Sequence, residues 1–167
     1  MQQAPYSASK GAKIGALGGI VGSIVLGLFA ELASATMSQE VFYVTIAKKL
    51  GLGDASIIGG WTMHFIVGLV AGAVFLGITA QVKTFTLTNT RRALWIGLLA
   101  GIAIWIIVYV PVTWLLVPAD LTSTMFAVGS LILHMVYGIV TALVALAVLR
   151  KSKTVITEKA SLASGKS

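Results

Sequence analysis

Gly59-Gly60-Trp61-Thr62-Met63-His64-Phe65-Ile66-Val67-Gly68-Leu69-Val70-Ala71-Gly72 lies inside an apolar run that extends from residue 57 to residue 80. A helix of this length is long enough to cross the hydrocarbon core of a bilayer, which is roughly 30 Å thick. His64, Gly68 and Gly72 follow one another at intervals of four, so they form one stripe on such a helix. The stretch therefore predicts a membrane-spanning helix that carries a histidine and a strip of small residues.

The same stripe returns in the second half of the chain as His134, Gly138 and Ala142. Small-residue pairs spaced by four also recur in the first and third apolar runs, as Gly18/Gly22 and Gly97/Gly101. Each half would then hold one outward-going and one inward-going helix, related by an axis along the membrane normal. The pattern favours a tandem repeat of a helical hairpin. The alternative is chance convergence on small residues, which membrane helices favour in any case.

Composition places the chain among integral membrane proteins. Hydrophobic residues make up 57% of its 167 residues and charged residues 10%, against about 25% charged residues in soluble domains. The chain has no cysteine, which excludes disulfides and thiolate metal sites. Its net charge of +7 comes from basic residues that flank the apolar runs. That placement indicates membrane topology and not nucleic-acid binding.

The predicted architecture is all-α, with one polytopic membrane domain over residues 13–150. A polar tail, residues 1–12, precedes this domain, and a basic disordered tail, residues 151–167, follows it. Four transmembrane helices are expected at about 14–34, 55–80, 93–117 and 123–149, with Pro111 bending the third. A short helix at about 40–50 is expected to lie in the membrane interface, on an apolar face formed by Val41, Phe42, Ile46 and Leu50.

The first apolar run has a second interpretation. Lys10 and Lys13, the apolar stretch and Ala33-Ser34-Ala35 together resemble a signal peptide with its cleavage site. Against cleavage, the stretch is longer than a usual signal sequence, and Glu31 lies just before the site. We therefore expect a retained helix.

The basic residues also predict the orientation of the chain. Ten lysines and arginines lie on the side of the two termini and of the loop between the second and third spans, against Lys48 and Lys49 on the other side. By the positive-inside rule, both termini are expected in the cytoplasm.

Small residues are expected to bring the helices together, because glycine lets two helix backbones approach closely. The predicted packing positions are Gly15, Gly18, Gly19, Gly22, Gly68, Gly72, Gly97, Gly101 and Gly138. These faces offer more close-packing surface than one four-helix bundle needs, and the polar loops are too short for a catalytic or receptor domain. The sequence therefore predicts contacts with lipids and with other membrane subunits.

His64 and His134 are expected at similar depth on parallel helices, where they could face each other. Ionisable groups inside a membrane are costly and are candidates for function. Three interpretations stay open. The imidazoles form hydrogen bonds between helices, with Ser23, Thr62, Ser130 or Tyr137 as partners; or they bind haem or copper; or they relay protons or a solute. Glu31 is expected to reach water at the interface, or to serve as a third ligand or proton acceptor beside them.

Gly60-Trp61-x-x-His64-x-x-x-Gly68, with the later His134-x-x-x-Gly138, resembles a pattern in small four-helix membrane proteins of prokaryotes, the YagU-like group and its archaeal relatives. The resemblance covers about residues 14–149, and the inserted helix at about 40–50 departs from it. It implies a four-helix inner-membrane fold and no defined activity.

These observations predict a non-catalytic accessory subunit of a larger membrane complex. No arrangement of a nucleophile with a base, phosphate-binding loop or zinc-protease motif is present in the sequence. The alternatives are a homo-oligomeric channel or carrier for protons or a small solute that uses His64 and His134, and a haem- or copper-binding subunit.

Overall fold

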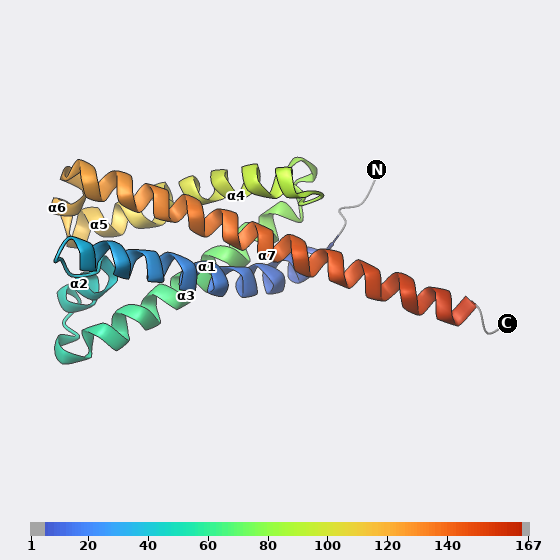
Figure 1. Ribbon diagram of the computed structural model, residues 1–167, viewed down its shortest axis with the longest axis horizontal. Coiled ribbons are helices and arrows are strands. Elements are labelled where there is room, and N and C mark those ends of the chain that lie inside the picture. The colour runs from blue at the N-terminus through green and yellow to red at the C-terminus, as the bar shows by residue number, and fades with distance from the viewer. Residues whose placement is uncertain (1–5, 165–167) are drawn as a thin grey trace.

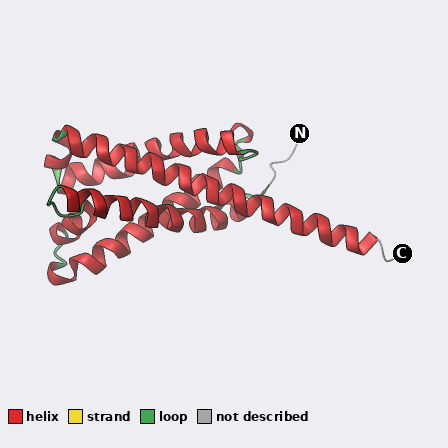
Figure 2. Cartoon of the chain, viewed as in Figure 1, coloured by secondary structure: helices red, strands yellow, loops and turns green. Residues whose placement is uncertain are grey.

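The described chain is helical throughout its regular structure, and four helices are long and apolar enough to cross a membrane (Figures 1 and 2). The structure, a computed structural model, describes residues 6–164, without the side chains of Lys83 and of residues 153–164. The α-helices are α1 (Ala8–Thr36), α2 (Phe42–Lys49), α3 (Ser56–Thr79), α4 (Thr90–Ile104), α5 (Val110–Leu116), α6 (Pro118–Thr122) and α7 (Thr124–Ser164). Short 3-10 turns precede α3 and α4, at Gly53–Ala55 and Lys83–Phe85. The predicted fold class, four spans with a short extra helix, is confirmed.

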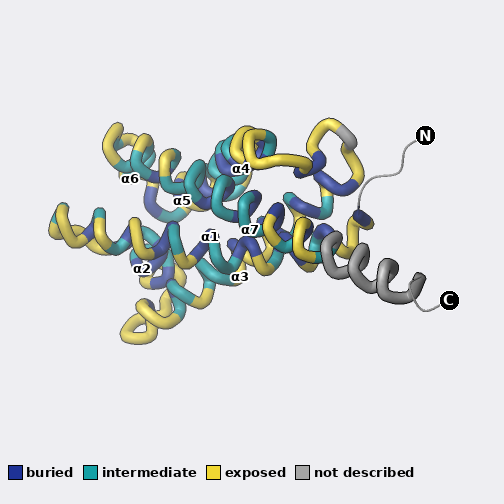
Figure 3. The backbone as a smooth tube through the Cα atoms, turned by 45° about the vertical axis from the view of Figure 1, so that its right-hand side comes forward, coloured by how far each residue is buried: buried dark blue, intermediate teal, exposed yellow. Residues whose placement is uncertain are grey.

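The four spans form two pairs. α1 packs against α3, and α4 packs against α7, while α1 also packs against α7 and joins the pairs. α3 begins beside α2, on the side of the bundle away from α4, and crosses toward the start of α4 (Figures 1 and 3), and an apolar groove of about 650 Å³ lies between them. The bundle is therefore closed on the side of α1 and α7 and open between α3 and α4.

The short helices gather at one end of the bundle, which we call the α2 end. α2, α5 and α6 lie there, whereas α1 begins and α7 ends at the opposite end (Figure 1). Large apolar side chains cover the outside of the spans, among them Leu28, Ile107 and Leu115, which are 61%, 71% and 77% exposed. In a bilayer these side chains would meet lipid.

The helices extend into both predicted tails. α1 begins at Ala8 because the Ser7 hydroxyl accepts a hydrogen bond from the Lys10 backbone N–H (3.2 Å), which caps the helix. α7 runs to Ser164, so the prediction of a disordered tail from residue 151 is wrong as far as that residue. Residues 151–164 contain lysine, alanine, leucine and glutamate but no glycine or proline, and such a composition favours a helix. Residues 1–5 and 165–167 lie outside the described residues.

α2 presents only part of the face that the sequence predicts, since Val41 and Phe42 pack inward while Leu50 does not. Tyr43, Val44 and Ala47 are buried, together with Val41 just before the helix, and α2 packs against α3. Leu50, expected on the apolar face, is 55% exposed. The apolar pattern missed this arrangement because the helix is anchored by a tyrosine and a small alanine, and not by its larger aliphatic residues.

Glycines bring α1 and α3 into backbone contact. Gly15 and Gly19 of α1 face Gly72 and Gly68 of α3. A Cβ atom added at Gly72 would lie 2.8 Å from the Cα of Gly19, closer than real Cβ atoms approach. This seam therefore requires glycine, and the close approach adds van der Waals contacts in a medium where apolar burial gives little.

The other predicted packing positions are also used inside the bundle. Gly18 and Gly22 face Thr141 and Tyr137 of α7, and the remaining three join α4 to α7: Gly97, Gly101 and Gly138. All nine glycines are buried. The expectation that they offer surplus surface to other subunits is therefore wrong.

The two helix pairs resemble each other in packing, with a register that differs from the predicted one. Gly97 faces Gly138 on α7 as Gly19 faces Gly68 on α3. Gly19, and not Gly18, is thus the counterpart of Gly97, and Ser23 takes the place of Gly101. The packing is consistent with a tandem repeat, which stays a prediction.

The third span contains a wider helical turn where the sequence predicts a bend. Residues Trp105–Tyr109 form a π-helical segment just before Pro111. Proline has no N–H to donate to the preceding turn, so one backbone hydrogen bond of the α-helix is missing there. The neighbouring backbone can then shift to π-helical hydrogen bonds. In this arrangement the Trp105 indole N–H donates to the Ser130 hydroxyl at 2.9 Å, linking this span to α7.

Candidate functional site

His64 lies within a group of aromatic side chains at the α2 end. Tyr43 of α2 stacks on the imidazole, with ring centroids 5.0 Å apart and planes inclined by 27°. Trp61, one turn before His64 on α3, meets it edge-on at 5.8 Å, and Phe42 lies at 6.2 Å. α2 therefore covers the first histidine.

His134 joins the same group through other rings. The ring centroid of Tyr109 lies 5.0 Å from His134 and 5.6 Å from Phe42. A continuous series of ring contacts thus runs from His64 through Phe42 and Tyr109 to His134. The two imidazoles belong to one site, but they are joined through these two rings, whereas the sequence left open a direct face-to-face pair.

Hydrogen bonds fix which ring nitrogen of each neutral histidine carries the proton. His64 Nε2 lies 2.9 Å from the Ser23 carbonyl oxygen on α1, and His134 Nδ1 lies 2.7 Å from the Ser130 carbonyl oxygen. A carbonyl oxygen only accepts, so both of these nitrogens donate. His64 thus forms the predicted bond between helices, through the backbone of Ser23, whereas the bond of His134 stays within α7.

Each imidazole keeps one further nitrogen, His64 Nδ1 and His134 Nε2, that forms no hydrogen bond with a described residue. These lone pairs are the atoms that would accept a proton or bind a metal. The described residues contain no group of three or more histidine, cysteine, aspartate or glutamate side chains suited to a metal ion. One ion would therefore meet at most these two imidazoles, with Phe42 and Tyr109 between them. Haem or copper binding stays a prediction.

Glu31 is linked to the histidine site through Tyr43. The Tyr43 hydroxyl donates to Glu31 Oε1 at 2.6 Å. Burial, and then the bond to the Glu31 carboxylate, raise the pKa of Tyr43 well above its ordinary value, so the hydroxyl stays protonated and remains a donor. Glu31 thus holds the tyrosine that stacks on His64, and it makes no direct bond to either histidine.

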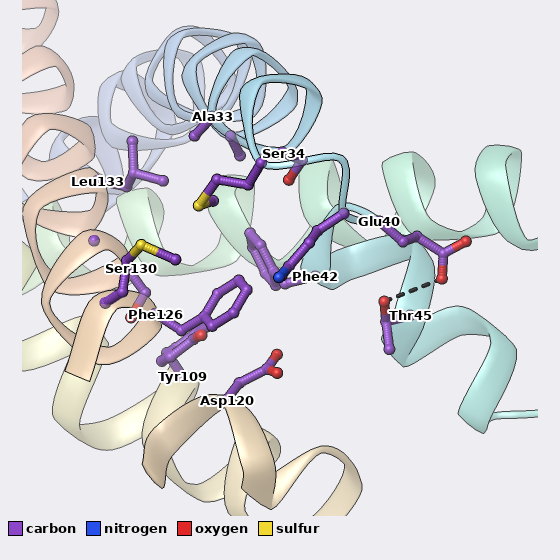
Figure 4. Close-up of a pocket in the computed structure, with 15 residues that line it drawn as sticks. Ala33, Ser34, Glu40, Phe42, Thr45, Tyr109, Asp120, Phe126, Ser130 and Leu133 are labelled. Atoms are coloured by element: carbon purple, nitrogen blue, oxygen red, sulfur yellow. Dashed lines mark hydrogen bonds between the residues drawn. The ribbon is translucent and has the colours of Figure 1, made fainter. Parts of the chain in front are cut away.

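A cavity of about 290 Å³ opens beside this cluster at the α2 end (Figure 4). Phe42 and Tyr109 line it, so one side of each ring faces the cavity region and another contacts a histidine. Neither histidine is among the described residues that line the cavity. Asp120 is the carboxylate deepest in this group, and burial raises its pKa above the ordinary value.

Below the histidines the bundle is tightly closed. The Tyr137 hydroxyl donates to the Gly68 carbonyl oxygen at 2.5 Å, and the Thr141 hydroxyl donates to that of Gly18 at 3.3 Å. Tyr137 and Thr141 are both buried. The arrangement can therefore hold a ligand or a proton from the α2 end, while these contacts between α1, α3 and α7 block passage toward the opposite end.

Sequence reasoning identified the histidines and Glu31 but missed the residues that connect them. These are Phe42, Tyr43 and Tyr109. Asp120, which lines the neighbouring cavity, was missed as well. Aromatic residues near a membrane interface are so common that their positions alone carry little information. One usable signal was Tyr43 itself, a hydroxyl-bearing residue placed among apolar neighbours in a helix too short to be stable alone.

The family comparison matches most of the chain. Residues 9–155 match the family model described as "Family of unknown function (DUF6789)". Comparison with curated proteins gave no match, and comparison with solved structures gave none. The matched region contains all four spans and every residue of the histidine site. The chain therefore belongs to the DUF6789 family.

Proposed function

We propose that this protein is a non-catalytic accessory subunit of a larger membrane complex, and that the groove between α3 and α4 receives a transmembrane helix of a partner. The observation that carries the proposal is the open apolar groove between these two spans. A monomeric four-helix bundle gains packing by closing on all sides, yet this bundle leaves two of its spans apart.

The shape of the groove favours a helix as its occupant. It follows α3 from Ile66 to Thr79, a length of roughly 20 Å at 1.5 Å per residue. Alanines lie at the places where a backbone would approach: Ala71, Ala100 and Ala103. Small residues on facing helices are the usual basis of helix association in membranes. Thr79 is the one polar side chain among the described residues that line it, so an apolar helix face fits.

The test is the mass of the particle extracted gently from native membranes, together with the identity of everything that travels with it. We expect a second protein at fixed stoichiometry. Ala100→Phe fills the groove and should release that protein. Ala147→Phe makes the same change on an exposed part of α7 and should retain it. A particle that contains only this chain and lipid, or one in which both variants behave alike, would refute the proposal.

A channel or carrier that uses His64 and His134 is the second candidate. Two observations support it: each imidazole has a ring nitrogen that forms no hydrogen bond with a described residue, and a cavity opens at the α2 end, separated from the histidines by Phe42 and Tyr109. The closed packing around Tyr137 argues against a continuous pore. A carrier would therefore need α1 and α7 to separate.

We further propose that the α2 end faces away from the cytoplasm and that both termini lie inside it, in a prokaryotic inner membrane. The ten-to-two distribution of basic residues supports this orientation. The chain has no cysteine, so single-cysteine variants give a clean readout. In intact cells a membrane-impermeant maleimide should label Ser38→Cys, which lies at the α2 end, and should spare Ala160→Cys until the cells are opened. The reverse pattern would overturn the orientation.

A further inference from the structure

The cavity at the α2 end combines aromatic walls with a carboxylate. Three of its lining side chains are aromatic: Phe42, Tyr109 and Phe126. Asp120 lines it beside them, and Figure 4 shows the four side chains next to one another. They come from four elements: Phe42 from α2, Tyr109 from the π-helical segment, Asp120 from α6 and Phe126 from the first turn of α7. The bundle therefore assembles this group only when it is folded.

The Asp120 carboxylate lacks a hydrogen-bond donor or a cation as partner within the described part of the chain. It forms no hydrogen bond or ion pair with any described residue, and it is partly buried. Glu40 at the cavity rim differs, because its carboxylate already binds the Lys48 ammonium group and accepts from the Thr45 hydroxyl at 3.1 Å. A partly buried carboxylate without a partner is costly. A cation that entered the cavity would remove that cost.

The chemistry of the walls selects the kind of cation. The faces of aromatic rings attract ammonium groups, and cages of such rings recognise alkylated ammonium ions. No lysine or arginine is among the described lining residues, so an anion would meet no cationic side chain there. The whole α2 end carries four carboxylates, Glu31, Glu40, Asp54 and Asp120, against two lysines, a formal charge of −2. This charge would draw cations toward the cavity.

We propose that the cavity binds an ammonium group, with Asp120 as its counter-ion and Phe42, Tyr109 and Phe126 as its walls. The volume of about 290 Å³ lies at the small end of ligand sites. It suits a small amine from the aqueous phase or the ammonium of a phosphatidylethanolamine headgroup. Both sources present the same group to Asp120. The site does not involve the groove between α3 and α4, so it stands or falls separately from the partner helix.

The test uses the full chain in nanodiscs of phosphatidylglycerol, titrated with ethylammonium or tetramethylammonium chloride at constant ionic strength and followed by calorimetry. Asp120→Asn keeps the shape and removes the charge, and we expect it to weaken binding about tenfold or more. Asp54→Asn removes a carboxylate that is exposed and lies outside the cavity, and it should bind as the wild type does. Phe126→Leu should also weaken binding, because it removes one ring and keeps an apolar side chain.

A second arm separates the two sources. If the headgroup is the ligand, the wild type will retain phosphatidylethanolamine selectively from mixed-lipid membranes, Asp120→Asn will lose that preference, and Asp54→Asn will keep it. If a free amine is the ligand, only the titration will respond to Asp120→Asn. Either result supports the site. The proposal is overturned if amines do not bind and no headgroup preference exists, or if the two aspartate variants behave alike while circular dichroism shows both folded.

Discussion

Gly72→Ala is expected to lower the stability of the bundle, while Gly77→Ala, five residues further along the same helix, is expected to leave it unchanged or raise it slightly. The added methyl group at position 72 would meet the backbone of α1, with the Cα of Gly19 at 2.8 Å. Neither backbone can move without separating the two spans. Overpacking of this kind costs about 1–3 kcal/mol.

The matched variant isolates packing from helix propensity. At Gly77 the nearest atoms to an added Cβ lie 3.9 Å away, which is ordinary contact. Alanine is the better helix former by up to about 1 kcal/mol in water, so any effect there should be stabilising. The measurement is the midpoint of thermal unfolding in a mild detergent. Equal shifts in the same direction would show that the backbone contact between α1 and α3 does not form.

Tyr43→Ala is expected to release α2 from the bundle. The side chain is 3% exposed, stacks on His64 and donates to Glu31. Removal of a large buried aromatic ring costs about 3–5 kcal/mol. An eight-residue helix has little stability of its own, so it should unfold once this anchor is lost.

Limited trypsin digestion measures this release, because Lys48 and Lys49 lie in the last turn of α2. We expect rapid cleavage there in Tyr43→Ala and slow cleavage in the wild type. Tyr43→Phe keeps the ring and loses only the hydrogen bond to the Glu31 carboxylate, worth about 1.5–3 kcal/mol, so its cleavage rate should lie between those of the wild type and Tyr43→Ala. If Tyr43→Ala resists trypsin as the wild type does, α2 is held by its other contacts.

The spans were predictable from the sequence because the thickness of a bilayer sets the length that an apolar run must have to cross it. The glycine seams were also predictable as a kind of contact, since nothing but close packing explains so many glycines in membrane helices. Their partners were not. The helices are apolar on all sides, so hydrophobic periodicity gives no sign that α3 and α4 stay apart while α1 lies between α3 and α7.

The candidate site was half predictable for a related reason. A histidine stands out in an apolar run because its presence there is costly, and both histidines do lie in the site. Phe42 and Tyr109, which connect them, look like any other aromatic residue near a membrane interface. In the sequence, Asp120 is a carboxylate in the short stretch between the third and fourth spans, and nothing there marks it as a site residue. Its value as a site residue depends on which side chains the fold brings around it.

The central position of α1 has a consequence for biosynthesis. Of the four spans, α1 leaves the ribosome before the others and its partner α3 follows next, so their glycine seam can close while the later spans are still being made. The other face of α1, with Gly18 and Gly22, must wait for Thr141 and Tyr137 of α7, the fourth of these spans. Until then this helix-packing face of small residues is exposed to lipid. The nascent chain thus passes through a stage in which α1 has packed only one of its two faces. The other face can then bind insertion chaperones or helices of other proteins.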